Sequence, residues 1–407
     1  MLNVVNSEQA QQIISSHLPV FNCTETVSLS ACIGRISARN VFSTENVPAF
    51  DRSVVDGFAV KASDTFGCSQ SLPSVLRLTD EVIMGNAANT VLDKGTCQKI
   101  PTGGCLPDGA DAVVMLEYCE DYNDGYIYVG KPAAVYENVV RCGDDIKIGE
   151  PVLKRGTYIT ARSVGILSSL GIDCVTVYNK IKIGLISTGD EIIPYTQTPQ
   201  IGQIRDINTV LLSELLLDNG TQIKQYPIVR DDIDELTLAV KRAVSENDIV
   251  VISGGSSAGD KDAAFDVLSL LGEVYFHGIA IKPGKPTMFS VVNNTPVFAL
   301  PGHPLAAALV TELFVKPAIY EMRGSVYFPI TLFAKSSVKI PSDHGRESVY
   351  PVTLQYADNE ISCTPLYSKS GVISVLQKAD GYIRIDRDCE GVNESQTVKV
   401  YLFARQI

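Results

Sequence analysis

The sequence has no tryptophan, no C-x-x-C motif and few histidines. Ten cysteines are scattered over 407 residues, and the four histidines are far apart in the chain. The cysteine spacing argues against a structural zinc site, and the dispersed histidines argue against a metal centre built from several of them. Scattered cysteines without a secretory signal are typical of reduced thiols, so we expect a cytoplasmic protein.

Long apolar runs and an excess of positive charge are also missing. No run reaches the roughly 18 apolar residues of a membrane span. Asp and Glu number 46 against 34 Lys and Arg, which leaves a net charge of -12. We therefore expect neither nucleic acid nor a membrane as partner. An anionic small substrate stays open, because distant exposed charges are screened beyond about 8 Å at physiological salt.

What is present indicates a globular chain of several domains. Hydrophobic residues make up 45% and charged residues 20% of the chain, enough to bury real cores. We predict a multidomain α/β and β protein with a parallel-rich sheet in its α/β domain. The predicted units are a discontinuous elongated domain (1–47 and 140–178), a β-rich insert (48–139), an α/β domain (179–323) and a C-terminal β-barrel-like domain (324–407).

The α/β domain is predicted from alternating strand and helix patterns. Expected helices outside it cover 6–17 and 29–40. Within it we expect strands at 180–187, 222–229 and 248–253, and helices at 208–220 and 231–245. This alternation is typical of a parallel sheet covered by helices, in which ligands bind beyond the carboxyl ends of the strands.

Three glycine-proline loops follow apolar runs that we interpret as buried strands. They are DIVVISGGSSAGDKD (248–262), IKPGKP (281–286) and FALPGHP (298–304), and STGDE (187–191) ends another strand. Glycines let the backbone approach a phosphate, and serines add hydrogen-bond donors. The alternative for the Gly-Gly-Ser segment is an ordinary N-capped turn between strand and helix.

Charged residues in these loops have two interpretations each. Asp190 and Glu191 could hold Mg²⁺ or could only favour a helix N-terminus. Asp262 could bind a metal or orient an attacking water. Lys282 and Lys285 flank a rigid Pro-Gly turn and could neutralise an oxyanion, although paired lysines are usually solvated surface.

His303 is expected to be a local hydrogen-bonding residue. Asp56 and Thr102, taken alone, belong to ordinary turns.

Eight short segments, taken together and in their order along the chain, resemble the motifs of a known family, although any one of them alone would be weak evidence. They are PAFDRSVVDGFA, TGGCLPDGADAVV, GDDIKIGEPVL, STGDE, GQIRDIN, SGGSSAGDKD, KPGKP and LPGHP. In this order they resemble the MoeA-like family of molybdopterin molybdenumtransferases, over nearly the whole chain. The resemblance implies a molybdopterin-binding α/β domain and a homodimer. In that dimer the insert of one subunit brings Asp56 and Thr102 to the site of the other. Contact with the molybdopterin adenylyltransferase is implied as well.

The implied reaction takes adenylylated molybdopterin and molybdate, cleaves the phosphoanhydride with help from Mg²⁺ and releases AMP. The implied catalytic residues are Asp56, Thr102, Asp145, Glu191, Asp231 and Asp262, with Glu191 and Asp262 also holding the metal. The implied substrate-binding residues are Ser253, Gly254, Gly255, Ser257, Lys282, Lys285, Pro301, Ser370 and Ser374.

Two positions depart from the family pattern. Gly278 stands where the family usually has a lysine, beside His277, and His303 replaces the asparagine of the last motif. If the missing lysine matters, Gly278→Lys should strengthen anion binding. The departures keep two alternatives open, a non-catalytic carrier or scaffold that binds the cofactor and a molybdopterin adenylyltransferase.

Overall fold

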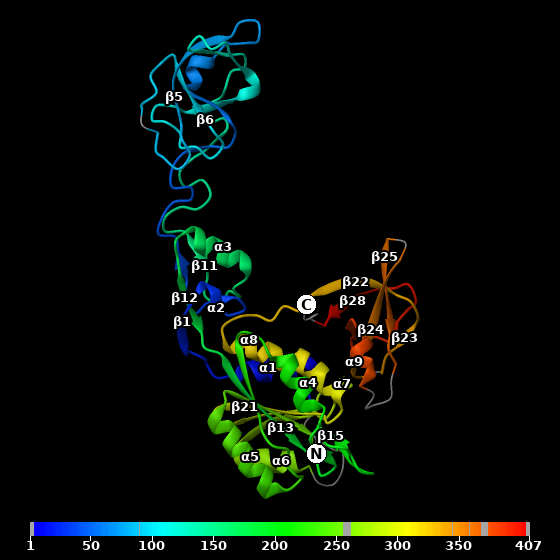
Figure 1. The fold of residues 1–407 in the computed structure, drawn as a ribbon. Helices are drawn as coiled ribbons and strands as arrows, with labels where there is room; N and C mark the ends of the chain where they lie inside the picture. Colours follow the sequence, from blue (N-terminus) through cyan, green and yellow to red (C-terminus); the bar gives the residue numbers. More distant parts are fainter. Residues whose placement is uncertain are drawn as a thin grey trace.

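The computed structural model describes residues 4–88, 90–254, 262–343, 345–357, 359–367 and 373–403. The chain is elongated, with the β-rich insert at one end, the α/β unit at the other and a C-terminal barrel beside the α/β unit (Figure 1). The predicted multidomain α/β and β class is confirmed. The residue boundaries of the four units stay a prediction.

The α/β unit is built on a six-stranded sheet in the order β16-β13-β17-β21-β20-β18. Neighbouring strands from β16 to β21 are parallel, and β20 is antiparallel to both of its neighbours. The strands are β13 (Ile181–Thr188), β16 (Thr221–Gln225), β17 (Ile249–Gly254), β18 (Glu273–His277), β20 (Met288–Val292) and β21 (Thr295–Leu300). The alternation predicted from residue 180 onward is therefore confirmed.

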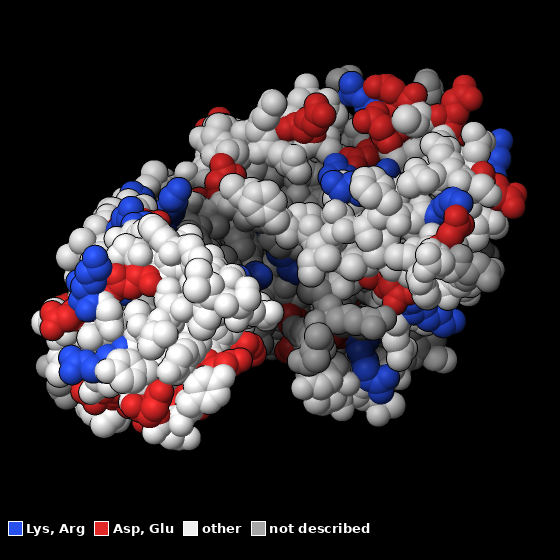
Figure 2. Space-filling view, turned by 90° about the horizontal axis from the view of Figure 1, so that it is seen from above, with Lys and Arg blue, Asp and Glu red and all other residues white. Residues whose placement is uncertain are grey.

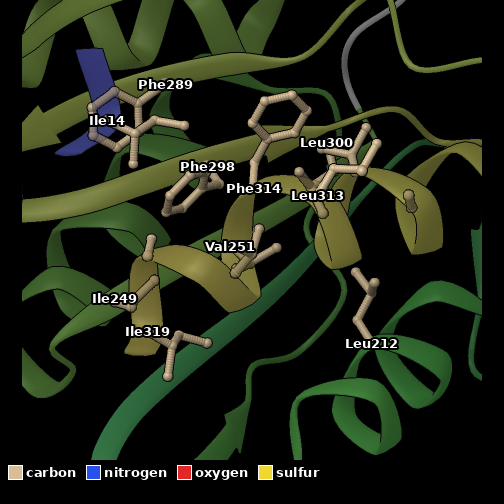
Figure 3. Packing of buried hydrophobic residues seen from close by; sticks show 14 of the residues in the cluster. Ile14, Leu212, Ile249, Val251, Phe289, Phe298, Leu300, Leu313, Phe314 and Ile319 are labelled. Carbon is tan, nitrogen blue, oxygen red and sulfur yellow. The ribbon is translucent and has the colours of Figure 1, made fainter. Parts of the chain in front are cut away.

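Helices cover both faces of this sheet because its strands are apolar on both sides. In β17, Ile249 and Val251 pack under α1, α4, α7 and α8, whereas Val250 and Ile252 pack under α5 and α6. Figure 3 shows the first of these cores, which Ile14 enters from the N-terminal helix. The helices are α1 (Ser7–Ser16), α4 (Asn208–Leu216), α5 (Ile233–Glu246), α6 (Ala263–Leu271), α7 (Pro304–Val310) and α8 (Lys316–Met322), with the π-helical turn η3 (Thr311–Val315) between the last two.

One predicted helix is wrong. Asn6 caps α1 with a capping box as expected, but the helix predicted over 29–40 is only the four residues of α2 (Leu29–Cys32). Gly34 takes a left-handed φ of 78°, which ends the helix. Beyond it Ile36 and Ser37 form bridges to Tyr158 and Val177, so tertiary pairing replaces helix.

The elongated part pairs segments from before and after the insert. The pairs are β1 (Thr24–Ser28) with β12 (Cys174–Tyr178), β2 (Val41–Phe42) with β11 (Pro151–Leu153) and β3 (Arg52–Ser53) with β10 (Val139–Val140). Helix α3 (Ala161–Ser169) packs against α2 and β11. These three antiparallel pairs form a neck that connects the insert to the rest of the chain (Figure 1). The position of the insert therefore depends on both chain segments.

The insert holds a second six-stranded sheet, in the order β7-β4-β6-β5-β9-β8. Its strands are β4 (Gly57–Val60), β5 (Ser74–Glu81), β6 (Thr96–Ile100), β7 (Ala112–Met115), β8 (Cys119–Asp121) and β9 (Tyr126–Val129). Two short 3₁₀ turns, Ala62–Thr65 and Leu116–Tyr118, connect them.

The C-terminal unit is a barrel that closes when β24 pairs with β26 as well as β25. Its strands are β22 (Thr331–Ser336), β24 (Glu347–Ala357), β25 (Glu360–Pro365), β26 (Gly381–Ile385) and β28 (Thr397–Leu402), with α9 (Ser374–Lys378) and the pair β23 (Ile340–Pro341) and β27 (Gly391–Val392) beside them.

The KPGKP loop corrects one sequence interpretation. We expected it to follow a strand of the α/β sheet. It begins instead in β19 (Ile281–Lys282), which pairs in parallel with β24 of the barrel. Strand β18 of the α/β sheet ends at His277, and the segment that follows it joins this sheet to the barrel.

Within the described residues, no helix is long and apolar enough to cross a membrane.

Candidate functional site

The candidate site lies at one edge of the α/β sheet, where three neighbouring parallel strands end together. Ser187 of β13 is in register with Ser253 of β17, and Ser253 is in register with Leu300 of β21. The ends of these strands therefore lie side by side. This is the edge at which parallel sheets bind ligands.

Asn208, the first residue of α4, joins the end of β17 to the loop that follows β21. Its Nδ2 donates to Ser253 Oγ at 2.7 Å and to the Gly302 carbonyl at 2.8 Å. Asn208 and Ser253 are both buried, so Ser253 fixes the end of β17 and shows little surface to a substrate. Asn208 is the last residue of the GQIRDIN segment and was not among the predicted site residues. The only local sign of its role is the Asp-x-Asn spacing at the start of a helix.

Asp206 binds the start of the same helix to the end of β13. Its Oδ1 accepts from Ser187 Oγ at 3.0 Å and from the Thr209 backbone N–H at 3.1 Å. The Ser187 and Thr209 hydroxyls are 2.8 Å apart. This buried network joins the end of β13 to α4 and was also not predicted as part of the site.

Gly254 is required by the backbone. Its φ is +104°, and a Cβ at this position would lie 2.1 Å from the Thr188 carbonyl oxygen. Gly302 approaches the same point, with a position for Cβ 3.7 Å from Gly254 Cα. The glycine that we predicted to admit a phosphate thus also permits β13 and β17 to end in contact. Gly255, Ser257 and Ser370, also predicted, lie outside the described residues.

Exposed acids gather beyond the end of β13. Thr188 Oγ1 donates to Asp231 Oδ1 at 2.7 Å, and the Asp231 N–H donates to Asp190 Oδ1 at 3.3 Å. The Glu191 backbone carbonyl accepts from Ile204 at 2.9 Å, where β14 (Ile192–Ile193) pairs with β15 (Ile204–Arg205). The structure thus brings Asp231, predicted from the resemblance, to the STGDE loop.

Asp262 is held at the start of α6 by both of its oxygens. Oδ1 caps the helix by accepting from the Phe265 N–H at 3.0 Å, and Oδ2 lies 3.2 Å from His277 Nε2. Burial raises the pKa of the Asp262 carboxyl, opposed by the Phe265 N–H and by His277. The sequence suggested His277 as a possible replacement for the missing anion-binding lysine, and gave no sign of its contact with Asp262.

The lysine and proline residues of the site have different surroundings. Lys282 Nζ contacts Asp343 Oδ2 of the barrel at 2.6 Å, while the side chain of Lys285 is exposed. Pro301 is buried. His303 occupies the N-cap of α7, but its side chain makes no capping bond to that helix, all of which is described.

Other predicted residues belong to other parts of the same chain. Asp56 and Thr102 belong to the insert, at the opposite end of the molecule from the α/β sheet (Figure 1). Asp145 is exposed on the neck, where its N–H donates to the Val47 carbonyl. Ser374 begins α9 beside the barrel and is exposed.

Asp56 and Thr102 do meet each other. Asp56 Oδ1 accepts from the Thr102 backbone N–H at 2.7 Å and from its hydroxyl at 3.0 Å. The backbone bond first, and then the hydroxyl bond, lowers the pKa of Asp56. The pair is therefore a charged, solvent-facing unit joining two turns 46 residues apart.

The described residues include no group of three or more His, Cys, Asp or Glu side chains arranged to hold a metal ion. The carboxylates at the strand ends are nevertheless hard oxygen donors. Such a donor set fits Mg²⁺, which usually takes one or two carboxylates and completes its shell with water and substrate phosphate.

Acidic and basic side chains are interspersed on the face that is seen from above in Figure 2. A cavity of about 600 Å³ lies elsewhere, between α1, η3, α8 and the barrel, and none of its lining residues comes from β13, β17 or β21.

These features define a multidomain α/β protein whose candidate site lies at the strand ends of its central domain. Family models match the chain in three consecutive parts. Residues 5–171 match "MoeA N-terminal region (domain I and II)", 184–321 match "Probable molybdopterin binding domain" and 334–403 match "MoeA C-terminal region (domain IV)".

Full-length relatives agree with these matches. A Methanocaldococcus jannaschii protein named for molybdopterin biosynthesis is 36% identical, covering 98% of both chains. The molybdopterin molybdenumtransferase of Haemophilus influenzae is 32% identical, covering 97% of this chain and 98% of its own. The crystal structure of a molybdopterin biosynthesis MoeA protein from Pyrococcus horikoshii superposes with a TM-score of 0.88 at 30% identity, covering 98% of this chain and 100% of its own. The chain belongs to the MoeA family.

Proposed function

We propose that this protein is a molybdopterin molybdenumtransferase, which inserts molybdenum from molybdate into adenylylated molybdopterin and releases AMP. The observation that carries this proposal is the end-to-end match to a relative of that name at 32% identity. The adenylyltransferase alternative is not favoured, because the chain matches the MoeA N-terminal and C-terminal models on either side of its molybdopterin-binding domain. The carrier alternative is not favoured, because a relative that matches from end to end is named as a transferase.

The strand ends support the binding of the phosphate end of the substrate. Gly254 gives the backbone at the end of β17 no side chain that would keep an anion away, and the Asn208 bridge holds this strand end against the loop that follows β21. Lys282 and Lys285 supply positive charge from the neighbouring turn. Donors fixed before the reaction stabilise charge on a leaving phosphate without reorganisation.

The acids of the site are suited to a magnesium-assisted cleavage. Glu191 and Asp262 are the residues that we propose to hold Mg²⁺, with Asp231 fixed nearby by Thr188. When bound, Mg²⁺ would withdraw charge from the phosphoanhydride. Asp262 keeps lone pairs on both oxygens beside its present bonds, so its hydrogen bonds do not prevent it from serving as a ligand.

A homodimer would explain why the insert carries Asp56 and Thr102 so far from the sheet edge. We propose that the insert of one subunit completes the site of the other, and that Asp145 on the neck and Ser374 by the barrel face the same space. Mixing Asp56→Asn chains with Asp262→Asn chains should then restore part of the activity that each homodimer lacks. Mixed samples without any recovery would contradict the shared site. Contact with the molybdopterin adenylyltransferase belongs to the proposal and can be checked by co-purification.

The central test measures AMP released from adenylylated molybdopterin with Mg²⁺, with and without molybdate. We expect release that depends on molybdate and that Asp262→Ala abolishes while the oligomeric state is unchanged. Substrate binding without release would indicate a carrier. Formation of adenylylated molybdopterin from ATP would indicate an adenylyltransferase. Unchanged turnover in Asp262→Ala would refute the role of Asp262.

A further inference from the structure

His277 and Asp262 form a mostly buried pair between a strand and a helix of the α/β unit. His277 is the last residue of β18, and Asp262 is the N-cap of α6. Nε2 lies 3.2 Å from Oδ2, and each side chain is 15% exposed. The pair is thus largely shielded from water, which strengthens its hydrogen bond relative to a surface contact.

The imidazole ring is oriented by its neighbours. It stacks on Phe265 with centroids 4.7 Å apart and planes inclined by 17°. Its backbone is paired with Met288 in the β18–β20 ladder. Phe265 lies in the first turn of α6 and donates its N–H to Asp262 Oδ1. Strand, ring stack and helix cap therefore converge on one carboxylate.

We propose that His277 is a positioning residue, which holds the Asp262 carboxylate in the orientation needed at the strand-end site. This inference rests on the proposed function. An aspartate with one oxygen on a helix cap can still rock about that contact, whereas a second bond to Nε2 fixes its plane. Partners that orient a functional carboxylate are typically worth about 10–100-fold in activity or metal affinity.

The family lysine cannot take over this role in the present chain. Gly278, at the lysine position, has a φ of +127°, and a Cβ there would lie 3.0 Å from Val4 Cγ2. The N-terminal segment closes this side, since the Val5 N–H donates to the Gly278 carbonyl and Val5 bridges Ile279. His277 is the neighbouring side chain that reaches Asp262.

The test uses the full-length protein and three variants, His277→Ala, His277→Gln and His17→Gln. Glutamine can place its amide nitrogen near the position of Nε2 and keep the bond. His17 is a matched control, since its ring also packs on an aromatic side chain, Tyr275, with centroids 3.7 Å apart. We expect kcat for AMP release to fall about 10–100-fold in His277→Ala, with KM changed less than kcat. His277→Gln should recover most of this loss, and His17→Gln should retain wild-type kcat.

A second measurement does not depend on activity. The melting temperatures of His277→Ala, Asp262→Ala and the double variant should be non-additive, with the double variant losing less than the sum. Wild-type kcat in folded His277→Ala, no rescue by folded His277→Gln, or additive losses would each overturn the proposal. Absence of AMP release from the wild-type protein would instead refute the proposed function, and the melting-temperature cycle would still report on the pair.

Discussion

Lys282 Nζ lies 2.6 Å from Asp343 Oδ2, so the lysine of the KPGKP turn is joined to the C-terminal barrel. The contact continues a backbone link, because Lys282 is in β19 and is in register with Ser348 of β24. Both side chains are largely solvent-exposed, at 56% and 40%. An anion that binds Lys282 must share or replace Asp343, and the barrel therefore influences the charge that Lys282 can offer to an anion.

Asp343→Asn should strengthen anion binding. Exposed ion pairs are worth about 0.2–1 kcal/mol, so freeing Lys282 should tighten AMP binding by roughly 1.4- to 5-fold. Calorimetric titration with AMP measures the change. Glu360→Gln removes the same charge from the Lys335 pair of the barrel and should leave affinity unaltered. Equal affinities in Asp343→Asn and wild type would show that Lys282 does not meet the anion.

Gly254→Ala should destabilise the protein, whereas Gly302→Ala should be tolerated. The first places Cβ 2.1 Å from the Thr188 carbonyl oxygen at a φ of +104°, and the second meets nothing closer than 3.7 Å. Left-handed strain costs about 1–2 kcal/mol and overpacking about 1–3 kcal/mol more. Urea unfolding of both variants gives the comparison. Similar losses in the two would mean that the β17 end relaxes freely.

Asn208→Asp should weaken the link between the end of β17 and the loop that follows β21. The substitution keeps the shape of the side chain but removes the amide that donates to Ser253 and Gly302. Leaving such buried acceptors unpaired costs about 1–3 kcal/mol. Asn293→Asp, in the exposed turn between β20 and β21, adds the same charge and should change the free energy of unfolding little. Matching losses in both would point to charge alone.

Thr102→Val should raise the pKa of Asp56. The Thr102 backbone N–H remains, but the hydroxyl that also stabilises the carboxylate is lost. A carboxyl group whose pKa is lowered in the folded protein stabilises the fold at pH values above its unfolded-state pKa. This contribution is lost as the pH falls through its folded-state pKa. Carboxyl ¹³C NMR should therefore show Asp56 titrating at higher pH in Thr102→Val. Thr79→Val, whose hydroxyl donates to Cys97 in the same insert, should leave Asp56 unchanged.

Gly278→Lys should lower stability by about 1–2 kcal/mol, the usual cost of a left-handed non-glycine residue. The family comparison alone predicts stronger anion binding, but the φ of +127° and the close Val4 side chain oppose a lysine here. Thermal unfolding and AMP titration measure both effects. Gly165→Lys, on the exposed surface of α3 with open space around it, is the control and should not destabilise. A stable Gly278→Lys protein with tighter AMP binding would favour the family expectation.

The α/β alternation was predictable because its signals are local. Apolar runs such as 248–253 and amphipathic helices such as α5 have their own periodicity, and the ends of adjacent parallel strands must meet. The helix predicted over 29–40 was wrong, because Gly34 and strand partners distant in sequence overrode its local pattern. The position of the KPGKP turn could not be predicted, because the strand that leads into it pairs with β24 of the barrel, which begins at residue 347.

The candidate site divides in the same way. STGDE, the Gly-Gly-Ser run and LPGHP could be assigned to strand ends from sequence, because each follows an apolar run. Asn208, Asp206 and His277 could not be singled out, because their partners lie 94, 19 and 15 residues away in Gly302, Ser187 and Asp262. A hydrogen bond across such a separation has no local pattern.

By itself the sequence determined the class of fold, the order of its motifs and the family, since periodicity and motif order are written along the chain. Tertiary structure alone decided which side chains meet. It joined Lys282 to Asp343, set His277 against Asp262 and closed the family lysine position with the N-terminal segment. The physical reason is that hydrogen bonds and steric contacts depend on distances of a few ångströms between segments, and packing sets those distances only when the whole chain has folded.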